Sequence, residues 1–375
     1  MWYALLIPVL CSIICYKYWP HKITIGELFI PIGVSFACIV ISYYSIKEIT
    51  MRDIEYNGEL VVEARYYEPY DTWVTRTCSY SCGTSKHPRT CYRDCSYCDH
   101  TSARYEVVLR DGSTVSVGEA KYLELVRKWN QTPEFVELNR NINYRFSCGK
   151  DGDMYCVKWD GKIKTSESHV REVYFSNPVK ISHSAFKFPD MAQQEADSLG
   201  LYHYPLLFSE YRQTALLAPI IYPDSVHVKF EYLNGLLGSS NKIKVFTMLF
   251  INKPIDIAFK QEQYFEGGNQ NELIVCIGID SLQTIQWVKP FSWCDNKRIC
   301  IDTREDIAEL HKFDPDSVIS IYYKNIPKYF HYKSFKDFNY LKFDPTRGQL
   351  IFVYIMTLLI SIGCCIFIVK NQIEP

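Results

Sequence analysis

Three runs of apolar residues lie at the two ends of the chain and enclose a polar middle. The runs are 1–16, 28–46 and 350–369, and none of them contains a charged side chain. A helix needs about 20 apolar residues to cross the hydrocarbon core of a bilayer, so the second and third runs have the length of membrane spans. The first run is shorter. It lacks the basic start and the small-residue cleavage site of a signal peptide, which is the alternative, so we expect it to be retained as a third membrane helix.

The short segments between and after these runs indicate a topology. Only residues 17–27 separate the first run from the second, which predicts a tight membrane hairpin. Three spans place residues 47–349 on one side of the membrane, and the short loop and the C-terminal tail on the other. Lys17, Lys22 and Lys370 lie in those short segments, and short cytoplasmic loops are enriched in Lys and Arg. We therefore predict an integral membrane protein whose large domain is extracytoplasmic.

The first half of the polar middle has the pattern of β-strands. Stretch 59–80 alternates apolar and polar residues in part and predicts two strands broken at EPYD. Asp111-Gly112 lies between strand-forming residues and predicts a hairpin over 104–118, followed by an amphipathic helix over 119–130. A further hairpin over 144–162 and a strand over 169–182 complete a β-rich, cysteine-containing lobe at 49–185, and a connector follows at 186–224.

The second half alternates helix and strand. The pattern predicts an α/β layer, at least partly parallel, over 225–348. Its expected helices are 226–238, 254–268 and 303–313, with Thr303 as the cap of the last. Its expected strands are 242–253, 271–280, 284–293 and 298–302. The predicted fold class is therefore α+β, with a two-lobed soluble domain between a transmembrane hairpin at 1–48 and a C-terminal transmembrane helix and tail at 349–375.

Residues 225–312 resemble the TPM-domain family, a small α/β module of membrane-anchored bacterial proteins and of a plant thylakoid phosphatase. The resemblance rests on a Val-rich strand, on a helix carrying AFKQEQYF, and on a glycine-rich turn into the next strand. That turn is formed by Gly267, Gly268, Asn269, Asn271, Glu272, Leu273 and Ile274. The aspartate-rich run that such modules use for divalent metal is missing, so the resemblance implies the fold more than an activity. The whole chain resembles uncharacterised multi-span membrane proteins of bacteria and phages, which implies no function.

Fifteen cysteines are present, and five of them lie between Cys78 and Cys98. Their spacing allows two interpretations. In the first, Cys78, Cys82, Cys95 and Cys98 bind zinc, which is held by four tetrahedral ligands. In the second, the bonds Cys78–Cys95 and Cys82–Cys91 staple a hairpin, since both pairs share one midpoint and would face each other across antiparallel strands.

Two further cysteine pairs flank short turns, as hairpin-closing bonds would. They are Cys148–Cys156 and Cys294–Cys300. Disulfides persist in oxidising compartments, so the extracytoplasmic placement favours bonds over zinc. We expect no cofactor, with zinc as the alternative.

The remaining signals favour a binding protein over an enzyme. A formal net charge of −1 gives no basic field for nucleic acid, and the sequence has no Walker A, G-x-S-x-G or H-E-x-x-H motif. We predict that the domain binds or scaffolds a protein partner, and that the bilayer is its other partner. The candidate ligand or partner surface is Asn269, Asn271, Glu272, Trp287 and Trp293. The alternative is a metal-dependent, phosphatase-like hydrolase of TPM type, with Asn269, Asn271, Glu272 and Asp280 near a divalent metal.

Overall fold

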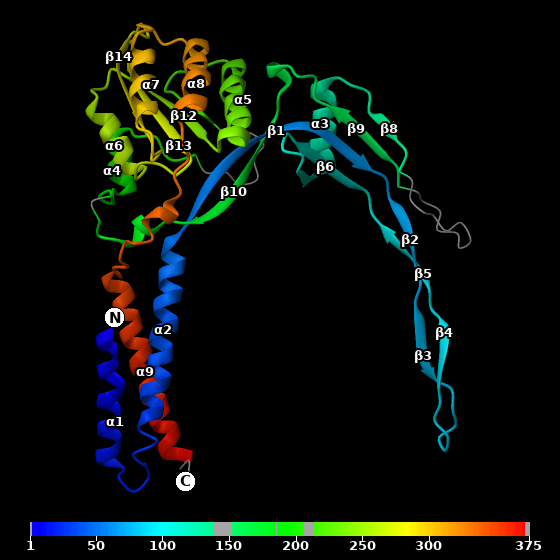
Figure 1. The fold of residues 1–375 in the computed structure, drawn as a ribbon, viewed down its shortest axis with the longest axis vertical. Coiled ribbons are helices and arrows are strands. Elements are labelled where there is room, and N and C mark those ends of the chain that lie inside the picture. The colour runs from blue at the N-terminus through cyan, green and yellow to red at the C-terminus, as the bar shows by residue number, and fades with distance from the viewer. Residues whose placement is uncertain (1, 139–151, 185, 206–213, 372–375) are drawn as a thin grey trace.

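The fold is that of a computed structural model, which describes residues 2–138, 152–184, 186–205 and 214–371. It is a mixed α and β structure, as expected. A bundle of helices is followed by two sheets: one extends into a narrow arm, and the other is covered by further helices (Figure 1). Short 3-10 helices at Ile163–Thr165 (η3), Pro178–Ile181 (η4) and Phe335–Phe338 (η5) connect these elements.

The bundle contains the three apolar runs. Helices α2 (Phe29–Met51) and α9 (Arg347–Asn371) are each long and apolar enough to cross a membrane. A shorter apolar helix covers Tyr3–Tyr18, formed by a 3-10 turn at Trp2–Leu5 (η1) and α1 (Leu6–Tyr18). All three lie side by side, and the link between α1 and α2 is at the end far from the sheets (Figure 1).

The buried residues of the bundle include small hydroxyl side chains, and its outer surface carries large apolar side chains. Ser12, Ser35, Thr357 and Ser361 are buried, and the hydroxyl oxygens of Ser35 and Ser361 lie 3.1 Å apart between α2 and α9. Outward-facing side chains include Leu10, Ile13, Phe36, Ile41, Leu359 and Phe367. Small hydroxyl residues at the contacts, with bulky apolar residues around them, are typical of helices packed in lipid.

Strand β1 (Arg52–Tyr67) follows α2 without a break and forms the centre of the first sheet. Its first half pairs with β10 (Ser168–Ser176), and its second half pairs with both β6 (Arg104–Leu109) and β9 (Met154–Lys158), all antiparallel. The edges are β7 (Thr114–Val117) and β8 (Glu134–Val136). Helix α3 (Glu119–Trp129) packs Tyr122, Leu125 and Trp129 onto this sheet.

The arm continues the first sheet beyond the break predicted at EPYD. Its upper ladder pairs β2 (Tyr70–Val74) with β5 (Tyr97–Thr101), and its lower ladder pairs β3 (Thr77–Ser81) with β4 (Thr90–Asp94). The arm extends away from the sheet, bends, and runs alongside the helical bundle without approaching it, so that its tip lies near the level of the end where α1 and α2 are linked (Figure 1).

The second sheet is covered by helices on both faces. Its strands run in the order β11 (Leu216–Leu217), β12 (Lys244–Ile251), β13 (Glu272–Ile279) and β14 (Ile285–Phe291), parallel except for the last. Alternate residues of β12 and β13 point to opposite faces. One set packs against α5 (Asp224–Asn241), α7 (Arg298–Ala308) and α8 (Pro315–Tyr329). The other set packs against α4 (Gln193–Leu199) and α6 (Asp256–Tyr264).

The sequence prediction is wrong around 298–302. These residues begin helix α7 instead of forming a short strand, and Thr303 is buried within the helix instead of capping it. Ile299, Thr303 and Ile307 recur every four residues and face the core, which is a helical period. A five-residue window cannot show that period.

Gly58 of β1 and Gly238 of α5 allow a close contact between the first sheet and this helix. Helix α5 crosses β1 so closely that a Cβ atom on Gly238 would lie 2.1 Å from the carbonyl oxygen of Gly58. Backbone therefore packs against backbone at this crossing, which fixes the first sheet against the helical layer.

Candidate functional site

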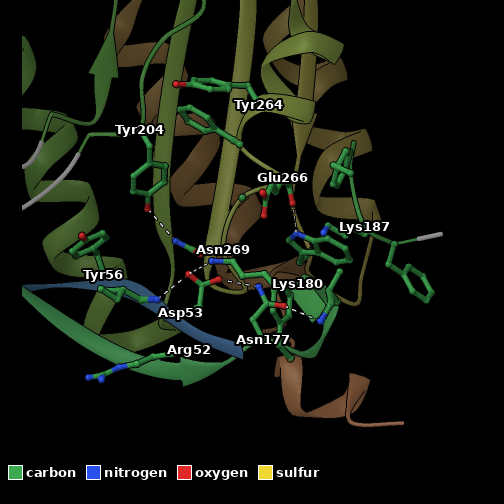
Figure 2. Close-up of a pocket in the computed structure, with 18 residues that line it drawn as sticks. Arg52, Asp53, Tyr56, Asn177, Lys180, Lys187, Tyr204, Tyr264, Glu266 and Asn269 are labelled. Carbon is green, nitrogen blue, oxygen red and sulfur yellow. Dashed lines mark hydrogen bonds and ion pairs between the residues drawn. The ribbon is translucent and has the colours of Figure 1, made fainter. Parts of the chain in front are cut away.

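A cavity of about 490 Å³ opens between the start of β1 and the second sheet, close to the end of α2 (Figure 2). Its walls come from seven segments: the start of β1, η4, the chain before α4, the chain after α4, the end of α6 with the turn that follows it, the chain after β14, and η5. Eight of the 18 residues that line it are aromatic. The aromatic residues are Tyr56, Phe186, Phe188, Tyr204, Tyr264, Phe265, Trp293 and Phe335.

Asn269 forms part of this wall. The three residues Glu266, Gly267 and Gly268 all have positive φ, at 51°, 80° and 82°, and this left-handed turn carries the chain from α6 into β13. The backbone N–H of Asn269 donates to Glu272 over 2.8 Å, and its side-chain amide donates to the Tyr204 hydroxyl over 3.2 Å. The Tyr204 hydroxyl in turn donates to Glu272. Asn269 is therefore held in one orientation.

Glu272 and Lys244 lie behind the wall, at neighbouring positions of β13 and β12, and both are buried. Burial lowers the pKa of Lys244 to about 7, and the Glu272 carboxylate opposes that change. Burial also raises the pKa of Glu272. The Lys244 Nζ has no hydrogen-bond partner among the described residues and lies 4.5 Å from the Tyr56 ring centre. This pair supports the wall from inside the sheet.

The next residues of the turn tie the second sheet to β1. Asn271 is fully buried, and its side-chain amide donates to the Tyr56 carbonyl over 2.9 Å and to the Asn57 side chain over 3.0 Å. Gln270 donates to Glu55 over 2.7 Å and accepts from the Phe335 N–H over 2.8 Å. Asn271 and Glu272, both predicted to face a ligand, therefore serve packing in this structure.

The residues proposed to surround a divalent metal are not brought together. Glu272 begins β13, while Asp280 follows its last residue, eight positions on. At about 3.3 Å per residue the two ends are roughly 25 Å apart. Asn269 and Asn271 lie with Glu272, far from Asp280. Within the residues that the structure describes, no three His, Cys, Asp or Glu side chains are grouped to hold a metal ion.

The two tryptophans of the predicted partner surface have different environments. Trp293 lines the cavity, lies 5.1 Å from the Phe335 ring centre, and donates its indole N–H to the Glu266 carbonyl over 3.4 Å. Trp287 lies over Gly278 and stacks on Phe250, away from the cavity. Asn269 and Trp293 are thus the only two of the five predicted residues among the cavity lining.

Charged groups border the cavity, and two of them, Asp53 and Lys180, pair with each other. Asp53 contacts the Lys180 ammonium group at 2.8 Å and accepts from the Asn177 amide over 2.9 Å. Lys187 and Glu266 are exposed at its edge (Figure 2). Sequence reasoning missed these residues because no local motif marks them, and only the fold brings them together.

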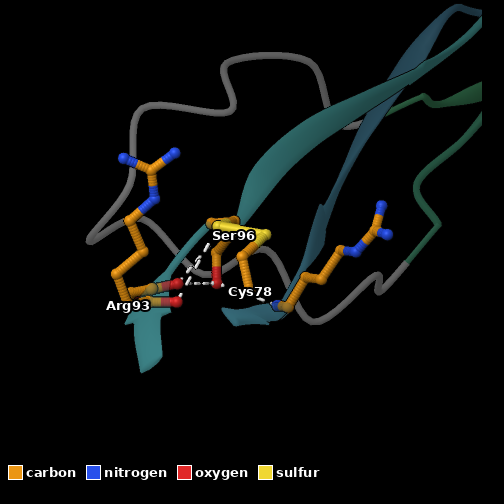
Figure 3. The surroundings of a disulfide bond; sticks show 6 residues. Cys78, Arg93 and Ser96 are labelled. Atoms are coloured by element: carbon orange, nitrogen blue, oxygen red, sulfur yellow. Dashed lines mark hydrogen bonds between the residues drawn. A yellow bond between two sulfur atoms is a disulfide. The ribbon is translucent and has the colours of Figure 1, made fainter. Parts of the chain in front are cut away.

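The cysteines of the arm form the two bonds that share a midpoint. Cys78 is joined to Cys95 and Cys82 to Cys91, with Cα atoms 5.8 Å apart in each pair, and Figure 3 shows the first of them beside Ser96. Cys98 is also disulfide-bonded. The four thiolates of the zinc hypothesis are therefore not free ligands here.

The other two predicted bonds are not formed. Cys294 and Cys300 are free, since Cys300 lies in the first turn of α7 instead of on a strand facing Cys294. Cys156 is free and buried in β9, which pairs with β1 and β8. The proposed partner of Cys156, Cys148, lies outside the described residues.

Comparison with known proteins yields no relative. No protein-family model matches the sequence, and no curated protein or solved structure is significantly similar to it. The resemblance of residues 225–312 to the TPM family stays a prediction.

Proposed function

We propose that this is a membrane-anchored binding protein whose sheets lie outside the cytoplasm. The apolar exterior of α2 and α9, their length and the buried hydroxyl groups between them support the anchor. Lys17, Lys22 and Lys370 lie at the end of the bundle far from the sheets, which supports a cytoplasmic position for that end. The disulfides of the arm support an oxidising compartment for the rest.

The cavity beside α2 is the binding site of this proposal, and its aromatic wall is the observation that carries it. The polar groups of the wall are mostly bonded to one another, as in the Asp53–Lys180 and Asn269–Glu272 contacts. The surface that stays open to a ligand therefore includes eight aromatic side chains on a pre-organised frame. Such pockets take a large apolar side chain, the kind of anchor that contributes most of the energy at protein interfaces.

The partner we propose is a protein segment next to a membrane. The cavity begins at Arg52 and Asp53, the first residues after α2, so it lies where the chain leaves the bundle. A segment that follows or precedes a membrane helix of another protein would reach it. Lys187 and Glu266 offer both charges at the edge, which suits the mixed backbone and side-chain polarity of a peptide better than a single-charge ligand.

Site-specific photocross-linking tests this proposal. A photoreactive amino acid replaces Phe186, a cavity residue that is 44% exposed, or Leu282, which is 76% exposed at the far end of β13. In native membranes we expect position 186 to yield one discrete adduct, whose linked peptide holds an aromatic or large aliphatic residue beside a membrane span.

The matched position 282 should not give that adduct. A Tyr264→Ala substitution in the position-186 protein should weaken it, since Tyr264 contributes to the cavity wall. Equal adducts at both positions, or a linked peptide from a segment remote from any membrane span, would contradict the proposal.

A further inference from the structure

The end of the arm is a concentrated patch of positive charge. We call residues 76–93 the basic tip: it contains Arg76, Lys86, Arg89 and Arg93 and not one carboxylate. All four cations are exposed, and none forms an ion pair within the described part of the chain. The whole chain has a net charge of −1, so this patch is a local feature and not a reflection of composition.

The acidic groups of the arm lie above the basic tip or at its upper end. Asp71 pairs with His100 at 2.6 Å in the upper ladder. Asp94, directly after the tip, accepts from the Ser96 backbone N–H over 2.8 Å and from its hydroxyl, and Arg93 points away from these groups (Figure 3). Asp99 lies higher, in β5. Hydrogen bonds from neutral groups leave the Asp94 carboxylate charged, so the positive charge of the tip is least compensated at Lys86 and Arg89, at the other end of the β3–β4 ladder.

The basic tip is also rigid and aromatic. The bonds Cys78–Cys95 and Cys82–Cys91 hold β3 against β4, although these strands bury almost nothing. Tyr80 and Tyr92 are 47% and 71% exposed. A hairpin fixed in this way loses little conformational entropy on binding, and tyrosines beside Lys and Arg are the side chains that proteins place at the headgroup level of a membrane.

The direction of the arm places its tip beside the helical bundle, and therefore beside the membrane if the bundle crosses one. The arm bends and runs alongside the bundle until its tip lies near the level of the end where α1 and α2 are linked (Figure 1). If α2 and α9 cross a bilayer, a hydrated tip with four cations is excluded from the hydrocarbon and meets the headgroups instead. The arm can bend where it joins the first sheet and so bring its tip to the membrane surface, because residues 68–69 and 102–103 interrupt both strands at the same level.

We propose that the basic tip docks on the anionic lipid headgroups of the same membrane that holds the helical bundle. Four cations that form no ion pair complement lipid phosphates, and the exposed tyrosines, with Arg93 over the Tyr80 ring, enter the interface beside them. The protein is then attached to the bilayer at two separated points, which fixes the orientation of the first sheet over the surface. This inference does not depend on what the cavity binds.

Energy transfer from the tip to the lipid surface tests the proposal. The full-length protein carries a fluorescent amino acid in place of Ser85, within the exposed turn of the tip, and is reconstituted into nanodiscs with acceptor-labelled headgroups. We expect transfer to be stronger in discs containing phosphatidylglycerol than in discs of phosphatidylcholine alone. High salt should remove the difference, because it screens exposed charges.

Two sets of substitutions decide the outcome. Arg76→Gln, Lys86→Gln, Arg89→Gln and Arg93→Gln together should abolish the dependence on anionic lipid. Neutralising four exposed cations around the second sheet, Lys253, Lys260, Arg304 and Lys312, should leave it unchanged. Counting reactive thiols before and after reduction verifies that the arm bonds remain in every variant. Retained dependence on anionic lipid in the tip variant would overturn the proposal. Equal transfer in neutral and anionic discs would also overturn it, and would favour an acidic protein as the partner of the tip.

Discussion

At the scale of single residues, Lys244 shows how the second sheet tolerates a basic side chain in its interior. Burial lowers the pKa of Lys244 to about 7 in the folded chain, from an ordinary value of 10.5. Between these values the unfolded chain binds more protons than the folded chain, so this group makes the free energy of unfolding rise with pH. Below about pH 7 both states are protonated, and the contribution of Lys244 no longer changes with pH.

We predict that Lys244→Met removes this rise. Chemical unfolding followed by tryptophan fluorescence, at about pH 7 and about pH 9, measures the change in the free energy of unfolding between the two conditions. The exposed Lys312→Met serves as the control and should keep the pH dependence of the parent protein. An unchanged pH dependence in Lys244→Met would show that Lys244 stays protonated through this range.

Gly238 illustrates a residue whose size, and not its chemistry, is required. Gly238→Ala would bring a Cβ atom into contact with the Gly58 backbone, which cannot rotate away as a side chain would. We predict a loss of about 1–3 kcal/mol in the free energy of unfolding, the usual cost of overpacking. Gly348→Ala, where nothing lies within 4 Å, is the matched control in the same denaturation experiment. A neutral Gly238→Ala would mean that α5 and β1 separate easily.

At the scale of elements, the sequence predicted those whose signals are local. The Asp111-Gly112 turn fixes β6 and β7, and the apolar runs of β12 and β13 identify buried parallel strands. The start of helix α7 was missed because its period emerges only over its full length. The cavity could not be predicted, because Asn177, Tyr204 and Trp293 become neighbours only through the pairing of distant strands and the packing of loops against them.

The contact between α2 and α9 allows a test of the bundle. Ser35 and Ser361 are buried and their hydroxyl groups form a hydrogen bond across the helices. In a double-mutant cycle of Ser35→Ala and Ser361→Ala we predict a coupling energy of about 0.6 kcal/mol, the average for such bonds in a membrane. Steric trapping in lipid bicelles measures it. The exposed Ser45→Ala should show no coupling with Ser361→Ala.

The arm depends on its bonds more than on its packing. Strands β3 and β4 are mostly exposed, so the bonds across loops of 9 and 17 residues supply much of their order. We predict that Cys82→Ser with Cys91→Ser accelerates amide hydrogen exchange in β3 and β4 and leaves the second sheet unchanged. Cys300→Ser, which removes a free thiol, should leave exchange in the arm as it was. Slow exchange in the arm without the Cys82–Cys91 bond would show that the strands are stable by themselves.

At the scale of the whole molecule, the bonds of the arm, the lysines of the short segments and the proposed lipid contact all depend on one topology. If α1, α2 and α9 each cross the membrane, the C-terminal tail and the loop 19–28 share one side, and the arm lies on the other. Disulfides then form where the arm is, and Lys17, Lys22 and Lys370 remain in the cytoplasm.

Reporter fusions in a bacterial host test this arrangement. Alkaline phosphatase, which needs its own disulfides, should be active when inserted after Ser85 and inactive when fused after Pro375, while a fluorescent protein after Pro375 should fluoresce. An N-terminal tag that persists in the mature protein would show that α1 is retained. The reverse pattern would place the arm in a reducing compartment, where its cysteines would be thiols, and would direct the basic tip toward the inner leaflet, whose surface carries the stronger negative potential.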